Sequence, residues 1–145
     1  MISPRHWRCV VLATLLLATT IPMRANADDT LYQRLGGQAG ITRIVEEAHA
    51  LFLADDRVKD DFDNINAKRL NTRLVEQICV LARGPCVYHG RSMAAAHNGL
   101  NVTQAKFNAV AEDLQTAMEH RGIPYWTQNQ LMALLAPMQR DIVTR

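Results

Sequence analysis

The sequence predicts an all-α domain. From residue 28 onwards, apolar residues recur at the three- and four-residue spacing of amphipathic helices, and the alternation of β-branched residues that marks strands is almost absent. The chain has 145 residues, of which 48% are hydrophobic. That length and composition suit one compact domain and argue against intrinsic disorder.

Residues 1–27 have the pattern of a cleavable export signal. Two arginines precede the apolar run 9–21, and Ala25 and Ala27 form a small-x-small cleavage site. The apolar run is too short for an ordinary membrane span, although an uncleaved anchor is an alternative. We therefore expect residues 28–145 to form an exported domain, free of the membrane after cleavage and located in a bacterial periplasm.

Removal of this segment changes the charge of the chain. The whole sequence carries a net charge of +2, but Arg5, Arg8 and Arg24 lie in the segment that we expect to be cleaved. The remaining chain has 13 basic and 14 acidic residues, a net charge of −1. Nucleic-acid-binding proteins normally carry a basic surface, so we expect no nucleic-acid partner.

Two long helices are expected in the first half of the domain. One begins after Gly36-Gly37 and ends near Asp55-Asp56, and its apolar face consists of Ile41, Ile44, Val45, Ala48, His49 and Phe52. The next begins at Asn66, a good N-cap, and stops before Gly84-Pro85. Its apolar stripe consists of Leu70, Leu74, Ile78 and Leu81.

Two more long helices are expected in the second half. One is capped by Thr103 and closed by the turn 122–124, and its stripe consists of Phe107, Val110, Leu114 and Met118. In the last, Pro137 should kink or weaken the helix. Its stripe consists of Leu131, Leu134, Leu135, Met138 and Ile142.

A short helix is expected between these two halves, from Ser92 to Asn98. At about two turns it cannot be stable by propensity alone, so another group must hold it in place. Met93 and His97 are four residues apart, so both side chains face the same partner.

The cysteines of the exported domain are an even pair, Cys79 and Cys86, because Cys9 would be cleaved off. Disulfides persist outside the cytoplasm, so these two form either a disulfide or two separate buried thiols. A metal cluster that adds His89 has too few ligands for a closed zinc site. No Cys-x-x-Cys-His motif occurs, which excludes a cofactor attached as in c-type cytochromes.

Four histidines remain, and only two have settings that favour a function. His120 belongs to a polar helix end and His89 to a loop, where both are expected to be solvated. His49 and His97 lie on apolar helix faces, where an unpaired imidazole is costly. Each can be a core histidine that bonds a backbone carbonyl, but two in one small domain favour a shared cofactor. Haem fits, since it has a large apolar face and an iron that binds neutral imidazole.

From about Leu31 to Val143 the sequence resembles the group I truncated haemoglobins, the shortened globins with a two-over-two helical sandwich. The matching segments are Leu31-Tyr-Gln-Arg-Leu-Gly-Gly37, Phe52-Leu-Ala-Asp-Asp56, Phe62, Gly84-Pro85, Tyr88-His-Gly90, Met93, His97 and Val102-Thr-x-x-x-Phe107. The resemblance implies non-covalent haem b, with His97 as the proximal iron ligand through Nε2 and with its Nδ1–H donating to a carbonyl.

The resemblance also implies which other residues contact the haem. Phe62 matches the phenylalanine that stacks on the haem, and Leu70, Leu74 and Ile78 match distal positions. Met93, Val102 and Phe107 match positions on the proximal side and the haem edge, and Tyr88 is carried over as a further cofactor-binding residue.

Three positions depart from the family pattern. His49 stands where tyrosine is common, Leu74 stands where glutamine is frequent, and Arg83 replaces the first glycine of the pair before Pro85. His49 is therefore either the distal hydrogen-bond donor to bound oxygen, which we favour, or a sixth ligand to the iron.

Two haem functions and one haem-free function follow as hypotheses. The first is reversible binding or transport of oxygen and other diatomic gases, with nitric oxide dioxygenation as an activity that needs an external reductase. The second is a redox or sensor module with bis-histidine iron, in which His49 is the distal ligand. The third is a haem-free helical scaffold. For each we expect a monomer or a weak dimer.

Overall fold

The structure, a computed structural model, describes residues 30–144. Over this range it consists of helices and loops, with no strand, which confirms the predicted fold class. The elements are α1 (Leu31–Arg34), α2 (Gly37–Ala54), α3 (Lys59–Phe62), α4 (Ala67–Leu81), α5 (Met93–His97), α6 (Gln104–His120), α7 (Tyr125–Leu135), the 3₁₀ turn η1 (Ala136–Met138) and α8 (Gln139–Ile142). The predicted export signal lies outside the described residues. Within them, no helix is both long and apolar enough to cross a membrane.

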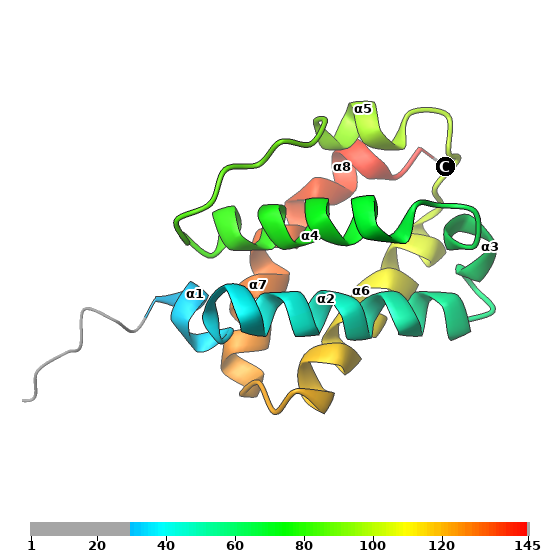
Figure 1. Cartoon of the computed structure of the whole chain (residues 1–145). Coiled ribbons are helices and arrows are strands. Elements are labelled where there is room, and N and C mark those ends of the chain that lie inside the picture. The colour runs from blue at the N-terminus through cyan, green and yellow to red at the C-terminus, as the bar shows by residue number, and fades with distance from the viewer. Residues whose placement is uncertain (1–29, 145) are drawn as a thin grey trace, which may run out of the picture.

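The long helices form two stacked pairs. Helix α2 runs beside α4 and also packs on α6, while α6 packs on α7 and α7 contacts α4 (Figure 1). Two helices thus lie over two others. The short helices α5 and α8 pack on each other, on the side of α4 opposite α2 in this view.

Side-chain caps fix where four of the helices begin. The side-chain oxygens of Thr30, Asn66, Ser92 and Thr103 each accept a hydrogen bond from the backbone N–H three residues later. Each bond satisfies an N–H that has no partner within its helix, and such a cap stabilises a helix by about 1 kcal/mol. The caps predicted at Asn66 and Thr103 are confirmed.

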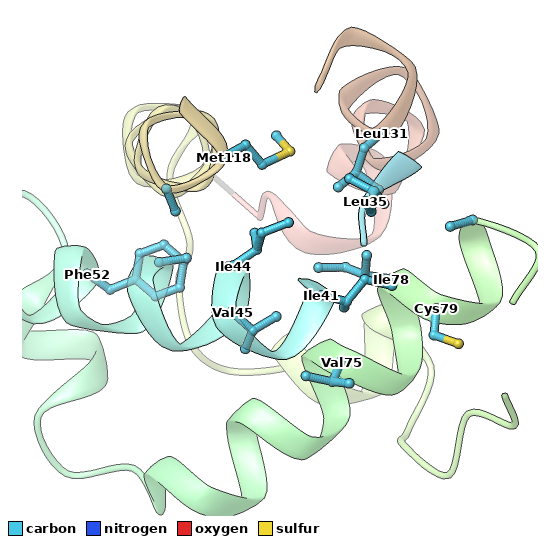
Figure 2. Close-up of a cluster of buried hydrophobic side chains, with 13 residues drawn as sticks. Leu35, Ile41, Ile44, Val45, Phe52, Val75, Ile78, Cys79, Met118 and Leu131 are labelled. Atoms are coloured by element: carbon cyan, nitrogen blue, oxygen red, sulfur yellow. The ribbon is translucent and has the colours of Figure 1, made fainter. Parts of the chain in front are cut away.

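The core lies between the stacked pairs. It is built from buried side chains of α2, α4, α6 and α7, which converge in Figure 2. All six residues of the predicted α2 face are buried, with 5% exposure or less. These residues are Ile41, Ile44, Val45, Ala48, His49 and Phe52.

The C-terminal helix breaks at Pro137, as predicted. Helix α7 ends at Leu135, and the chain continues through η1 into α8. The predicted stripe is partly wrong, because Leu131 is fully buried whereas Leu134 is 41% exposed. Leu131 and Leu135, which are four residues apart on α7, face the core, whereas Leu134 lies beside them on the solvent side of the same helix.

Cys79 and Cys86 form a disulfide, with their Cα atoms 6.0 Å apart. Of the two alternatives that the sequence left open, the bridge is therefore the one that the structure shows. It ties the loop after α4 back onto that helix. The bridge also removes both thiolates that a metal cluster with His89 would need, and no such cluster occurs within residues 30–144.

Candidate functional site

His97 is oriented by a hydrogen bond within its own short helix. Its Nδ1 lies 2.9 Å from the carbonyl oxygen of Met93, one turn earlier. A carbonyl only accepts, so Nδ1 carries the hydrogen and Nε2 has a free lone pair. The side chain is half-buried. A neutral imidazole with its other nitrogen bound to a carbonyl is the usual state of a histidine that ligates a metal.

His49 is held by a second hydrogen bond, between helices. The side chain is 5% exposed on α2, and its Nδ1 lies 2.7 Å from Oδ1 of Asn71 on α4. The ring of Phe62 lies 6.5 Å from the His49 ring, centroid to centroid, and stacks on Phe52 at 4.8 Å. The structure thus brings together two of the predicted site residues, His49 and Phe62.

The other predicted site residues are apolar and mostly half-buried. Ile78 is 3% exposed and belongs to the core, on which Phe62 and Leu74 also pack. The remaining ones are half-buried and are not part of that cluster: Leu70, Tyr88, Met93, Val102 and Phe107. Partly exposed apolar side chains, together with two imidazoles in the same small domain, suit a large flat apolar ligand that binds a metal, so the chemistry of these residues fits a haem.

Comparison with known proteins decides the family. The bacterial-like globins match residues 30–144, the whole described range. The chain belongs to this globin family. It is 30% identical over 115 residues to a group 1 truncated haemoglobin from Mycolicibacterium paratuberculosis, which covers 79% of this chain and 85% of that protein. It is also 35% identical over 94 residues to one from Tetrahymena thermophila, with 65% and 78% covered.

Solved structures agree with this assignment. The ferric truncated haemoglobin of Tetrahymena pyriformis superposes with a TM-score of 0.77 at 27% identity, covering 80% of this chain and 99% of that one. A two-over-two haemoglobin from Synechococcus, described with covalently attached haem, gives 0.74 at 25% identity, with 80% and 99% covered. This protein is therefore a haem-binding globin with the truncated, two-over-two fold.

Two residues that contact the predicted site have no counterpart in the sequence predictions. Asn71 bonds His49, and Gln77 places its Nε2 3.3 Å from the sulfur atoms of both Met93 and Met138. Gln77 thereby links α4 to the first residue of α5 and to η1. Both are ordinary polar residues on a helix with an apolar stripe. Only their positions could have distinguished them from other polar residues of this helix: Asn71 directly follows Leu70, and Gln77 lies about one turn after Leu74.

The loop before α5 is attached to α4 by charge as well as by the disulfide. Glu76 accepts hydrogen bonds from the backbone N–H of His89 at 3.0 Å and from Arg73 at 2.7 Å. These contacts, first the His89 N–H and then Arg73, lower the pKa of Glu76 to about 2. The His89 ring is exposed and lies 3.3 Å from the same carboxylate.

The histidine at the end of α6 is exposed, as predicted. His120 lies 3.0 Å from a carboxylate oxygen of Glu47, which also pairs with Arg121. The hydrogen bond from His120, with the Arg121 charge, lowers the pKa of Glu47. This arrangement is a surface ion-pair network that joins α2 to the end of α6.

Proposed function

We propose that this globin is an exported haem b protein that binds oxygen and other diatomic ligands reversibly, with His97 as the proximal iron ligand. The observation that carries the proposal is the hydrogen bond from His97 Nδ1 to the Met93 carbonyl. It selects the tautomer whose Nε2 can bind iron, and it orients the ring from within the same short helix.

We propose further that the haem is held without a covalent bond. Attachment as in c-type cytochromes uses free cysteines, and the two in the described residues are joined to each other. The half-buried apolar side chains of the predicted site would instead hold the haem by burying its faces. Acetone extraction of the haem at acid pH tests this proposal: complete transfer to the organic phase supports it, and retention on the protein contradicts it.

The location outside the cytoplasm is also a proposal. It is supported by the export pattern of residues 1–27 and by the disulfide, since such bonds persist mainly in oxidising compartments. Fractionation of cells that express the full chain tests it. Recovery of a shortened protein from the periplasmic fraction supports export, and recovery of the full-length protein from the cytosol contradicts it.

The reaction that we propose for the oxygen-bound protein is the oxidation of nitric oxide to nitrate. A haem held by His97 would supply the one electron that the conversion of one oxygen molecule and one nitric oxide molecule to nitrate requires. An external reductase must then return the electron. Stopped-flow mixing of the oxygen-bound protein with nitric oxide tests the step. Rapid formation of ferric haem with stoichiometric nitrate supports it, and an unreactive oxygen complex restricts the function to binding or transport.

The absorption spectrum of the purified protein tests ligand binding itself. We expect a Soret band after haem reconstitution, and a reversible spectral change when the ferrous protein is exposed to oxygen and then to argon. Failure to form a Soret band would contradict haem binding. Irreversible oxidation on the first exposure would contradict reversible oxygen binding.

A second candidate function is supported by the bond between His49 and Asn71. If His49 binds the iron as a sixth ligand, the protein is a bis-histidine redox or sensor module that must open before oxygen binds. His49→Ala would then convert a low-spin spectrum into a high-spin one. An unchanged spectrum would exclude His49 as a ligand.

A further inference from the structure

The contact between His49 and Asn71 is a short polar bond in a largely apolar setting. His49 is 5% exposed, and its Nδ1 is 2.7 Å from Asn71 Oδ1. The nearby aromatic ring of Phe62, 6.5 Å away between centroids, neither donates nor accepts a conventional hydrogen bond. Asn71 is therefore the polar side chain that orients this imidazole across the α2 and α4 interface.

The atoms in contact determine where the imidazole hydrogen lies. An amide oxygen only accepts hydrogen bonds, so a 2.7 Å contact with Nδ1 requires the hydrogen on Nδ1. A neutral imidazole has one N–H, so Nε2 then carries the lone pair. With the Asn71 amide in the orientation that the structure shows, the reverse tautomer would place the lone pairs of Nδ1 and Oδ1 against each other, which is repulsive.

We propose that Asn71 is a positioning residue that holds His49 in the Nδ1–H tautomer and presents the Nε2 lone pair to the distal face of the haem. The proposal rests on the proposed haem site. In this tautomer His49 can ligate the iron, but it has no Nε2–H to donate to bound oxygen. Asn71 thereby assigns His49 the role of a displaceable sixth ligand rather than the donor role that the sequence favours.

The same pairing gives the distal side a defined way to open. With Nε2 as the sixth ligand, oxygen would bind only after Nε2 had left the iron, while the Nδ1 bond to Asn71 would keep the ring within the α2 and α4 interface. Ligand association is then limited by dissociation of His49, and its rate stops increasing at high ligand concentration. Substitutions of Asn71 should therefore change the limiting rate of ligand association while the proximal ligand stays the same.

Two substitutions of Asn71 separate its tautomer effect from its packing. Asn71→Asp keeps an acceptor against Nδ1, so we expect the low-spin ferric and ferrous spectra of the unaltered holoprotein to persist. Asn71→Leu is close in size but removes the acceptor. We expect it to increase the high-spin fraction and to raise the limiting rate of carbon monoxide association at least tenfold. Thr72→Val, at an exposed neighbour whose hydroxyl bonds only within α4, is the matched control.

A double variant tests whether Asn71 acts through His49. In a His49→Leu background, Asn71→Leu should leave the spectrum and the association rate unchanged, because the imidazole that it orients is gone. A tenfold effect that persists in this background would overturn the proposal. So would equal spectra and rates for the Asn71→Leu holoprotein and the unaltered one.

The tautomer can also be observed directly. In the diamagnetic carbon monoxide complex, nitrogen-15 NMR of the His49 ring should show hydrogen on Nδ1 and none on Nε2. Hydrogen on Nε2 would overturn the proposal and restore the donor role. Failure of the proposed haem site is distinguishable, since the unaltered protein and all variants would then lack a Soret band.

Discussion

The backbone N–H of His89 donates a hydrogen bond to the carboxylate of Glu76, across 3.0 Å. Three residues after Glu76, the disulfide from Cys79 to Cys86 joins the same helix to the same loop. The segment that leads to α5, the helix of the proposed proximal ligand His97, is therefore fixed to α4 at two points. Because α5 has only five residues and cannot be stable alone, these attachments limit where its histidine can lie.

Loss of the disulfide should destabilise the protein. Cys79 and Cys86 are seven residues apart, and closing so small a ring contributes about 2 to 3 kcal/mol on the chain-entropy model. We expect Cys86→Ala to lower the free energy of unfolding by about this amount, as measured by urea denaturation in oxidising buffer. This variant leaves Cys79 in the core, so the loss reflects the missing bridge rather than a cavity.

Reduction provides the control for that substitution. A thiol reductant should lower the stability of the unaltered protein to that of Cys86→Ala and should have no effect on the variant itself. Equal stability of the two proteins in oxidising buffer would contradict a stabilising disulfide.

Glu76 should make stability depend on acid pH. Its pKa in the folded protein, about 2, is below the ordinary value of 4.5, so folding favours the ionised carboxylate. The stabilisation is fully present above pH 4.5 and is lost as the pH falls towards 2. Glu76→Gln should therefore unfold at a lower temperature than the unaltered protein at pH 6, and the difference should shrink between pH 4.5 and 2.

A matched substitution separates this effect from a change in net charge. Glu46→Gln also removes one negative charge, from an exposed position on α2. The melting temperature of Glu46→Gln should exceed that of Glu76→Gln at pH 6. Identical melting curves for the two variants from pH 6 to pH 2 would show that the contacts of Glu76 add nothing specific.

Removal of the His97 side chain should remove the proximal ligand of the iron. His97→Gly should weaken haem binding and alter the Soret band, and free imidazole added in solution should restore the band, because it can bind in the space left by the side chain. His120→Gly removes a histidine from an exposed helix end and should leave the spectrum unchanged. An unaltered Soret band in His97→Gly would assign the ligand to another residue.

Helix positions and the α2 core face could be predicted because they depend on local rules. A cap such as Asn66 acts within one turn, and the period of apolar residues on α2 is uninterrupted from Ile41 to Phe52. The last stripe was less successful, because the spacing of apolar residues does not specify which of two neighbouring leucines faces the core. Leu135 packs against the core, and Leu134 is exposed.

The partners of the site residues could not be predicted, because they depend on how two helices pack. His49 was recognised from its apolar face, but its bond to Asn71 depends on the register between α2 and α4. The contact of Gln77 with Met93 and Met138 likewise joins three elements that are far apart in the sequence. The partner of His97 could be anticipated, because the Met93 carbonyl lies one helical turn away and local helix geometry brings it next to the ring.

Leu131 and Leu134 should respond very differently to the same substitution. Leu131 is fully buried in the core, so Leu131→Ala should cost about 2 to 5 kcal/mol of unfolding free energy. Leu134, on the same helix, is 41% exposed, so Leu134→Ala should cost less than about 0.5 kcal/mol. Chemical denaturation of both variants measures the difference. Equal losses would show that α7 packs through the continuous stripe after all.

Arg83 adopts the left-handed conformation at the end of α4, with φ at 61°. Two hydrogen bonds define the turn: Gly84 N–H donates to the Cys79 carbonyl at 2.7 Å, and Arg83 N–H donates to the Val80 carbonyl at 3.0 Å. This pair of bonds is the Schellman motif, in which the left-handed residue after the cap is usually glycine. A side chain there costs about 1 to 2 kcal/mol, because its Cβ approaches the following carbonyl oxygen.

Arg83→Gly should therefore stabilise the protein, although glycine also adds entropy to the unfolded chain. With that opposing contribution of about 0.5 to 1 kcal/mol, we expect a net gain of about 0.5 to 1 kcal/mol in the free energy of unfolding. Arg43→Gly, at an exposed position within α2, removes the same side chain where glycine is unfavourable and should lose about 1 kcal/mol. Urea denaturation of both variants gives the sign. A loss in Arg83→Gly would mean that the arginine side chain makes contacts worth more than the backbone strain it imposes.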